Sequence, residues 1–162
     1  MSVFRLGCIV LLAGCATTVQ IAIVPWGELV LALAGVLLFL YSFPTSFTFA
    51  LAGGFFLDLV GGSFGLRLVI FPLFVIAGRA LTSSVLTDRS LLSAGILSVV
   101  GYLTVSAALL SASVVRAIIT GSVLAPVISL TLIKEIIIGV FVQLVVVIIS
   151  YGVMSLVTRG RK

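Results

Sequence analysis

Long apolar stretches, separated by short polar or glycine-rich breaks, dominate the pattern of this chain. An apolar stretch of about 20 residues is long enough to cross the hydrocarbon core of a bilayer as an α-helix. The predicted membrane-spanning helices are 5–24, 29–43, 46–60, 66–85, 91–113 and 134–157. The less regular segment 114–132 is expected to be a connector that lies against the membrane or dips into it. We therefore predict an all-α, polytopic integral membrane protein, with residues 1–162 forming a single transmembrane domain.

The breaks contain residues that end helices or favour the membrane surface. Trp26 lies in the first break, where an amphipathic ring is suited to the interface. Pro44 is expected to end the second stretch, because it lacks a backbone N–H and disfavours helix in the residue before it. Asp88 is a candidate N-cap for the fifth helix. The second and third stretches hold about 15 residues each, so neighbouring helices or a locally thinner bilayer must compensate for their shortness.

Composition supports a lipid environment and excludes several kinds of site. Hydrophobic residues make up 62% of the chain and charged residues 8%, more apolar surface than a soluble domain of this length can bury. The nine basic residues are scattered, so no basic patch for nucleic acid is expected. The chain has no histidine, and Cys8 and Cys15 both lie in the first stretch. We therefore predict no metal site, no cofactor site and no catalytic residues, and hence no enzyme.

The positions of the basic residues predict the orientation in the membrane. Arg159, Arg161 and Lys162 follow the last stretch, and Arg5 precedes the first, so the positive-inside rule places both termini in the cytoplasm. This requires an even number of crossings, and six satisfies it. Six crossings leave Arg116 on the outer side; if residues 114–132 formed a seventh span, one terminus would move across the membrane.

Asp58 is the most informative residue of the apolar stretches. A carboxylate within an apolar helix costs a few kcal/mol to insert, so it needs a partner. Arg67 follows the glycine-rich turn that contains Gly61, Gly62 and Gly65, and its side chain could return alongside Asp58. The residues from the third stretch to the fourth therefore predict an ion pair that locks this turn, while a proton relay or a ligand site at Asp58 stays open.

Small residues near Asp58 indicate a place where helices approach closely. Ala50 and Gly54 are four residues apart, and Gly53 widens the same shallow face, as in membrane helices that pack tightly. The partner helix could belong to this chain or to another protein. A separate alternative concerns Cys15, since the preceding Leu-Ala-Gly resembles the recognition sequence of a lipoprotein. The single Arg5 and the continuation of the apolar stretch past Cys15 favour a retained helix.

The central region resembles a known family. Residues 54–67 read GFFLDLVGGSFGLR, which resembles the rod shape-determining protein MreD family in its glycine, apolar stretch, Asp-Leu pair and glycine-containing turn. The turn at 87–91, the total length and the basic C-terminus are also similar. The segment is one residue shorter than usual, and Gly61 stands where serine is common.

The resemblance implies a non-enzymatic subunit of the cell-wall elongation machinery in the bacterial cytoplasmic membrane. It implies an MreC-like protein, an MreB-like filament, and the wall polymerase and transpeptidase as partners. It also implies a helical fold similar to the substrate-binding subunits of energy-coupling-factor vitamin transporters. That similarity supplies the alternative function, a small substrate-binding membrane subunit of a vitamin or solute transporter. Such a protein should have a cavity on which polar or aromatic side chains converge.

Overall fold

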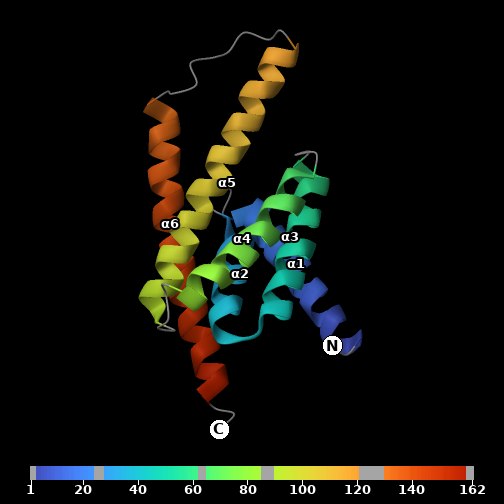
Figure 1. Cartoon of the computed structure of the whole chain (residues 1–162), viewed down its shortest axis with the longest axis vertical. Helices are drawn as coiled ribbons and strands as arrows, with labels where there is room; N and C mark the ends of the chain where they lie inside the picture. Colours follow the sequence, from blue (N-terminus) through green and yellow to red (C-terminus); the bar gives the residue numbers. More distant parts are fainter. Residues whose placement is uncertain (1–2, 24–27, 62–64, 85–89, 121–129, 160–162) are drawn as a thin grey trace.

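The described part of the chain is a bundle of α-helices. A computed structural model describes residues 3–23, 28–61, 65–84, 90–120 and 130–159. Within them the all-α prediction is confirmed, since every regular element is an α-helix (Figure 1). The helices are α1 (Val3–Ile23), α2 (Leu29–Leu40), α3 (Phe43–Gly61), α4 (Leu66–Ser84), α5 (Leu91–Thr120) and α6 (Leu130–Arg159).

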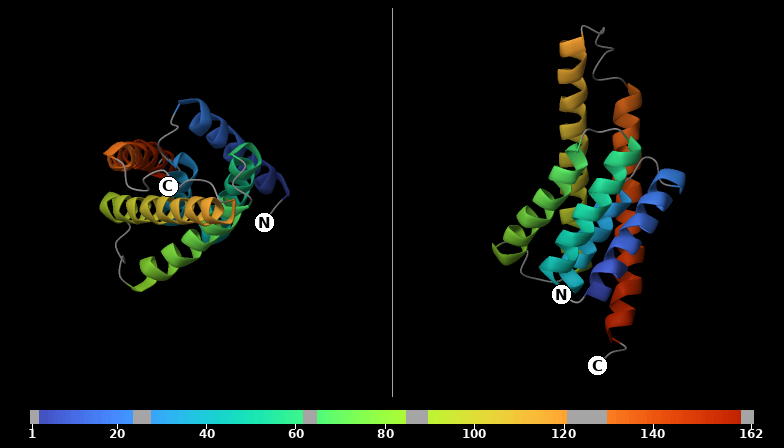
Figure 2. Two further views of the ribbon diagram at one scale, coloured as in Figure 1. Left: turned by 90° about the horizontal axis from the view of Figure 1, so that it is seen from above. Right: turned by 90° about the vertical axis from the view of Figure 1, so that its right-hand side faces the viewer.

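Successive helices run in opposite directions. α1 begins and α6 ends at the same end of the bundle, which we call the terminal end; the opposite end is the distal end (Figure 2). The α2–α3 connection lies at the terminal end, whereas α1, α3 and α5 finish toward the distal end (Figure 1). This arrangement suits an even number of crossings.

Five helices of the described part are long and apolar enough to cross a membrane, and α2 is the shorter apolar helix. With 12 residues, α2 is about 18 Å long, far less than a hydrocarbon core of about 30 Å. It contacts each of the other five helices, and Leu31, Ala34 and Val36 are fully buried. Because the surrounding helices shield it, α2 does not have to match the thickness of the bilayer.

The predicted end of the second helix and the predicted start of the third are corrected, since α2 ends at Leu40 and α3 begins at Phe43. Pro44 lies in the first turn of α3 rather than at the end of the preceding helix, a position where its missing N–H costs no helical hydrogen bond. The break falls instead at Tyr41 and Ser42.

The predicted connector is also partly helical. α5 continues through Thr120, and α6 begins at Leu130, so the prediction of an irregular segment over 114–132 was wrong for its first and last residues. Residues 114–120 are mostly apolar, and a single arginine among them does not break a helix. Residues 121–129 lie outside the described residues.

The buried apolar side chains form two clusters. One joins α1, α2, α3, α4 and the middle of α5 and includes Leu31, Phe49 and Phe71, while the other joins α2 to α5 and α6 and includes Phe39 and Leu97. The first cluster packs the helices that carry the polar side chains described next.

Candidate functional site

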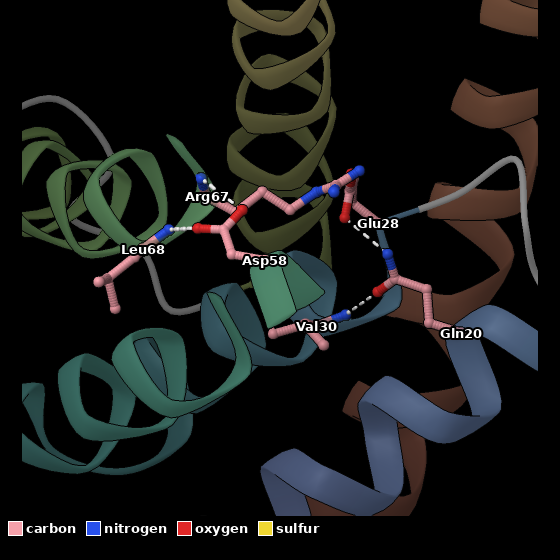
Figure 3. Close-up of polar contacts among 6 residues, drawn as sticks. All are labelled: Gln20, Glu28, Val30, Asp58, Arg67 and Leu68. Atoms are coloured by element: carbon pink, nitrogen blue, oxygen red, sulfur yellow. Dashed lines mark hydrogen bonds and ion pairs between the residues drawn. The ribbon is translucent and has the colours of Figure 1, made fainter. Parts of the chain in front are cut away.

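The end of α1 is tied to the start of α2 by Gln20 and Glu28. The Gln20 Nε2 donates a hydrogen bond to Glu28 Oε2 at 2.7 Å, and the Val30 N–H donates to Gln20 Oε1 at 3.1 Å (Figure 3). Val30 is in the first turn of α2, where N–H groups have no partner within the helix. Gln20 therefore caps α2 from a neighbouring helix and also orients Glu28.

Asp58 caps the first turn of α4, as Gln20 caps that of α2. Its carboxylate accepts the backbone N–H of Leu68 at 2.8 Å and that of Arg67 at 3.3 Å (Figure 3). A carboxylate at this position satisfies unpaired N–H groups and faces the positive end of the helix dipole. Gly65, immediately before α4, has a φ of 78°, a conformation that glycine adopts without strain.

Arg67 connects the two pairs. Its Nε and Nη2 atoms both lie 3.4 Å from Glu28 Oε1, and the side chains of Arg67 and Glu28 are only 19% and 8% exposed. Residues from the ends of α1 and α3 and the starts of α2 and α4 thus form one hydrogen-bonded group. We call Gln20, Glu28, Asp58 and Arg67 the polar cluster.

The charged side chains of the polar cluster are largely buried and are stabilised by hydrogen bonds and by the ion pair between Arg67 and Glu28. Glu28 stands before the first residue of α2; burial raises the pKa of its carboxyl, and Arg67 and the hydrogen bond from Gln20 oppose that rise. The polar cluster thus combines two acidic side chains, Glu28 and Asp58, with one basic side chain, Arg67. Removing one partner from such a group leaves a buried charge without compensation, which is costly.

The predicted link between Asp58 and Arg67 exists in a different form. Asp58 binds the backbone N–H of Arg67, whereas the guanidinium of Arg67 reaches Glu28 across 39 positions of sequence. The interpretation of Asp58 as a lock on the α3–α4 turn fits this geometry.

Gly53 and Gly54 pack against helices of this same chain. A Cβ on Gly54 would lie 2.7 Å from the backbone oxygen of Arg67, and a Cβ on Gly53 would overlap the side chain of Val30. Both glycines are buried, so they bring α3 close to α4 and α2 rather than to a partner protein.

The remaining candidate residues of the sequence analysis are not part of the polar cluster. Gly61 is the exposed last residue of α3, and Gly62 lies outside the described residues, as does Asp88. Cys15 is exposed on α1, which continues past it to Ile23.

Sequence reasoning missed Gln20 and Glu28. Glu28 lies in the first break between apolar stretches, close to Trp26, and no role was predicted for it from the sequence. The chain has only four acidic residues, and this scarcity could have marked Glu28 as a candidate. Gln20 could have been noticed as a polar residue near the end of an apolar stretch.

The described residues contain no group of three or more histidine, cysteine or acidic side chains that could hold a metal ion. A groove of about 680 Å³ between α5 and α6 is lined almost wholly by apolar side chains, among them Leu92, Ile96 and Ile148. A smaller cavity of about 300 Å³ has more polar walls, with Tyr102 and Glu135 among its lining residues.

No protein-family model, curated protein or solved structure matches this chain. The geometry of the described residues supports a structural role, in which the polar cluster fixes how the ends of four helices meet.

Proposed function

We propose that this protein is a non-enzymatic membrane subunit of the cell-wall elongation machinery, which acts through helix–helix contacts with partner proteins. The observation that carries the proposal is the polar cluster. Asp58, the residue that bears the resemblance to the MreD family, is used to dock α4 on α3. Its hydrogen bonds go to backbone groups of the same chain, which suits a scaffold.

The partners proposed are those of the family: an MreC-like protein, an MreB-like filament, and the wall polymerase and transpeptidase. The short connections between the helices favour contacts within the membrane. The proposed location is the bacterial cytoplasmic membrane, with both termini in the cytoplasm. Arg5, Arg79 and Arg159 all lie in the terminal halves of their helices, which agrees with the positive-inside rule.

The test uses cells of the native host in which the chromosomal copy of the gene is repressed. Repression is expected to turn rods into round cells, and the plasmid-borne chain should restore rods. Glu28→Gln should restore them poorly, because Arg67 loses its ionic partner. Glu135→Gln, which removes an exposed carboxylate from α6, is the matched control and should restore rods fully. Cells that remain rods after complete repression would refute the proposal.

A second candidate is the substrate-binding subunit of a solute transporter, with a fold similar to that of the energy-coupling-factor subunits. The cavity lined by Tyr102, Ser106, Ser113 and Glu135 favours it, because these polar groups face a space of about 300 Å³. Native mass spectrometry of the purified protein discriminates between the two candidates. One small molecule bound per chain, lost in Glu135→Gln, would support a transporter subunit over a scaffold.

A further inference from the structure

The apolar groove between α5 and α6 follows the terminal half of α5. Three successive turns of α5 form one wall, with Leu92, Ile96 and Val100 among its side chains, and Leu144 and Ile148 of α6 form the other. Among the described residues that line the groove, Ser90 is the only polar one, and it stands at the end where α5 begins. The wall side chains are exposed, Leu92 to 74% and Ile148 to 54%, so the groove opens to the surroundings of the bundle.

The length of the groove matches one leaflet of a bilayer. From Leu91 to Val100 it follows nine residues of helix, which is about 14 Å, and half of a hydrocarbon core of about 30 Å is about 15 Å. Spread over this length, the volume of about 680 Å³ gives a cross-section of about 50 Å². A helix with its side chains is at least 10 Å across and needs about 80 Å². The groove therefore suits flexible acyl chains, which are narrower, better than a further helix.

The mouth of the groove is the first turn of α5. Ser90 caps this helix, because its Oγ accepts the Ser93 N–H at 3.2 Å and its carbonyl oxygen accepts the Ala94 N–H at 3.2 Å. The N–H groups of Leu91 and Leu92 have no partner within the helix. Both residues line the groove, so the positive end of the helix dipole lies at its mouth. A helix N-terminus of this kind favours a phosphate group.

The first turn of α5 is also at the level of a membrane surface. Gln143 Nε2 donates a hydrogen bond to Ser98 Oγ, which fixes the register of the two antiparallel helices. Ser90 and Tyr151 are each eight residues from this bond, toward the terminal end, so they lie at about the same level. A tyrosine ring is suited to the interface, and in Figure 1 the first turn of α5 lies near the height of the α2–α3 connection.

We infer that one glycerophospholipid of the leaflet at the terminal end binds to this chain, with its acyl chains in the α5–α6 groove and its phosphate on the first turn of α5. Two observations select this occupant. The groove is apolar along the length of one leaflet, and the end that reaches the membrane surface has the positive charge complement that a phosphate diester requires.

The first test measures binding to the whole delipidated chain in detergent by native mass spectrometry. The probe is dioleoylphosphatidylglycerol, and dioleoylglycerol, which has the same acyl chains but no phosphate, is the matched probe. We expect saturable binding of one phosphatidylglycerol per chain. Dioleoylglycerol should bind about tenfold more weakly, the loss expected for a hydrogen-bonded charged group. Equal affinities for the two probes, or binding that does not saturate at one lipid, would overturn the inference.

A pair of substitutions at Ser90 tests the phosphate position while the helix cap is kept. Aspartate and asparagine have the same shape, and both are good N-cap residues. Ser90→Asp places a negative charge at the mouth of the groove and should weaken phosphatidylglycerol binding about tenfold, because like charges placed together repel. Ser90→Asn should bind as the wild type does. Equal affinities of the two variants would contradict a phosphate at this turn.

A second pair tests the groove itself. Ile148 lines the groove and is 54% exposed, whereas Ile149 is 61% exposed and is not among the lining residues. Ile148→Trp, which fills the groove, should lower the affinity at least tenfold, and Ile149→Trp should leave it unchanged, with wild-type helix content in both. Equal effects at the two positions would sink the inference. A wild-type dimer that Ile148→Trp converts to a monomer would do so too, because a second copy would then occupy the groove.

This lipid site goes beyond the proposed function and is tested separately from it. Cell shape after repression and lipid binding by the purified chain are independent measurements, so either proposal can fail alone. Glu135→Gln changes the cavity that Tyr102 and Glu135 line and should leave phosphatidylglycerol binding unchanged. Loss of the probe in Glu135→Gln would place the lipid in that cavity and would also overturn the inference.

Discussion

Replacing Asp58 by alanine removes the carboxylate that holds the first turn of α4. The Leu68 N–H bond, at 2.8 Å, has good geometry, and the Arg67 N–H bond, at 3.3 Å, is long, so the bond to Leu68 contributes more. Losing a side-chain cap costs about 0.5–2 kcal/mol. Because Asp58 is partly buried, we expect the upper half of this range, about 1–2 kcal/mol, for Asp58→Ala.

Asp58→Asn separates the hydrogen bond from the charge. Its side-chain oxygen can still accept from Leu68, but the negative charge at the positive end of the helix dipole is lost. That charge is worth about 0.3–1 kcal/mol, so the asparagine variant should fall between the wild type and Asp58→Ala in stability.

The assay is unfolding in mixed micelles, in which rising SDS content is followed by circular dichroism. Hydrogen–deuterium exchange supplies the local readout: if α4 opens from its first turn, the amides of Arg67 and Leu68 should exchange about tenfold faster for each 1.4 kcal/mol lost. Glu135→Ala is the control and should change stability by less than about 0.5 kcal/mol. Wild-type stability together with unchanged exchange at both amides in Asp58→Ala would refute the capping role.

The remaining predictions concern other packed contacts. Gly54→Ala should lower the free energy of unfolding by about 1–3 kcal/mol, because its Cβ would meet the Arg67 carbonyl oxygen at 2.7 Å; chemical denaturation measures this. Arg67→Met should destabilise by about 3 kcal/mol by leaving Glu28 buried without its cation, and adding Glu28→Gln should recover part of that loss in a double-mutant cycle. Ser98→Ala should cost about 1–3 kcal/mol, since Gln143 is fully buried and donates to Ser98 Oγ at 2.9 Å; the same substitution in a Gln143→Leu background should cost little.

Each of these predictions has a control and a contrary outcome. Gly7→Ala should be neutral or slightly stabilising, because a Cβ there meets nothing within 4 Å; equal losses at positions 7 and 54 would contradict close packing. Arg79 is exposed and lies 4.8 Å from the centre of the Phe43 ring, so Arg79→Met should cost less than about 1 kcal/mol. Strict additivity in either double-mutant cycle would mean that the paired side chains are not coupled.

Several features of the fold could be predicted from the sequence because they depend on local composition. Apolar stretches of this length can be solvated by lipid only if their backbone groups are bonded within the segment, which forces helices. The glycine-rich turn before α4 and the special position of Asp58 were also visible. The length of α5 was underestimated because the whole segment after residue 113 was judged less regular, whereas the helix continues through Thr120.

The partners of the polar residues were decided by the tertiary structure. Polar residues such as Gln20 and Glu28 are common near a membrane surface. The neighbouring sequence does not show whether such a residue only faces the interface or caps another helix. Arg67 and Glu28 are 39 positions apart, and only the packing of α1–α4 brings their side chains together. The sequence by itself determined that the chain is a set of apolar helices, because burying backbone in lipid is a local requirement. Three features depend on contacts between segments that are distant in the sequence, and a sequence pattern does not record such contacts. They are the packing of α2 among the other five helices, the N–H groups that Asp58 and Gln20 cap, and the length by which α5 and α6 extend beyond their neighbours (Figure 1).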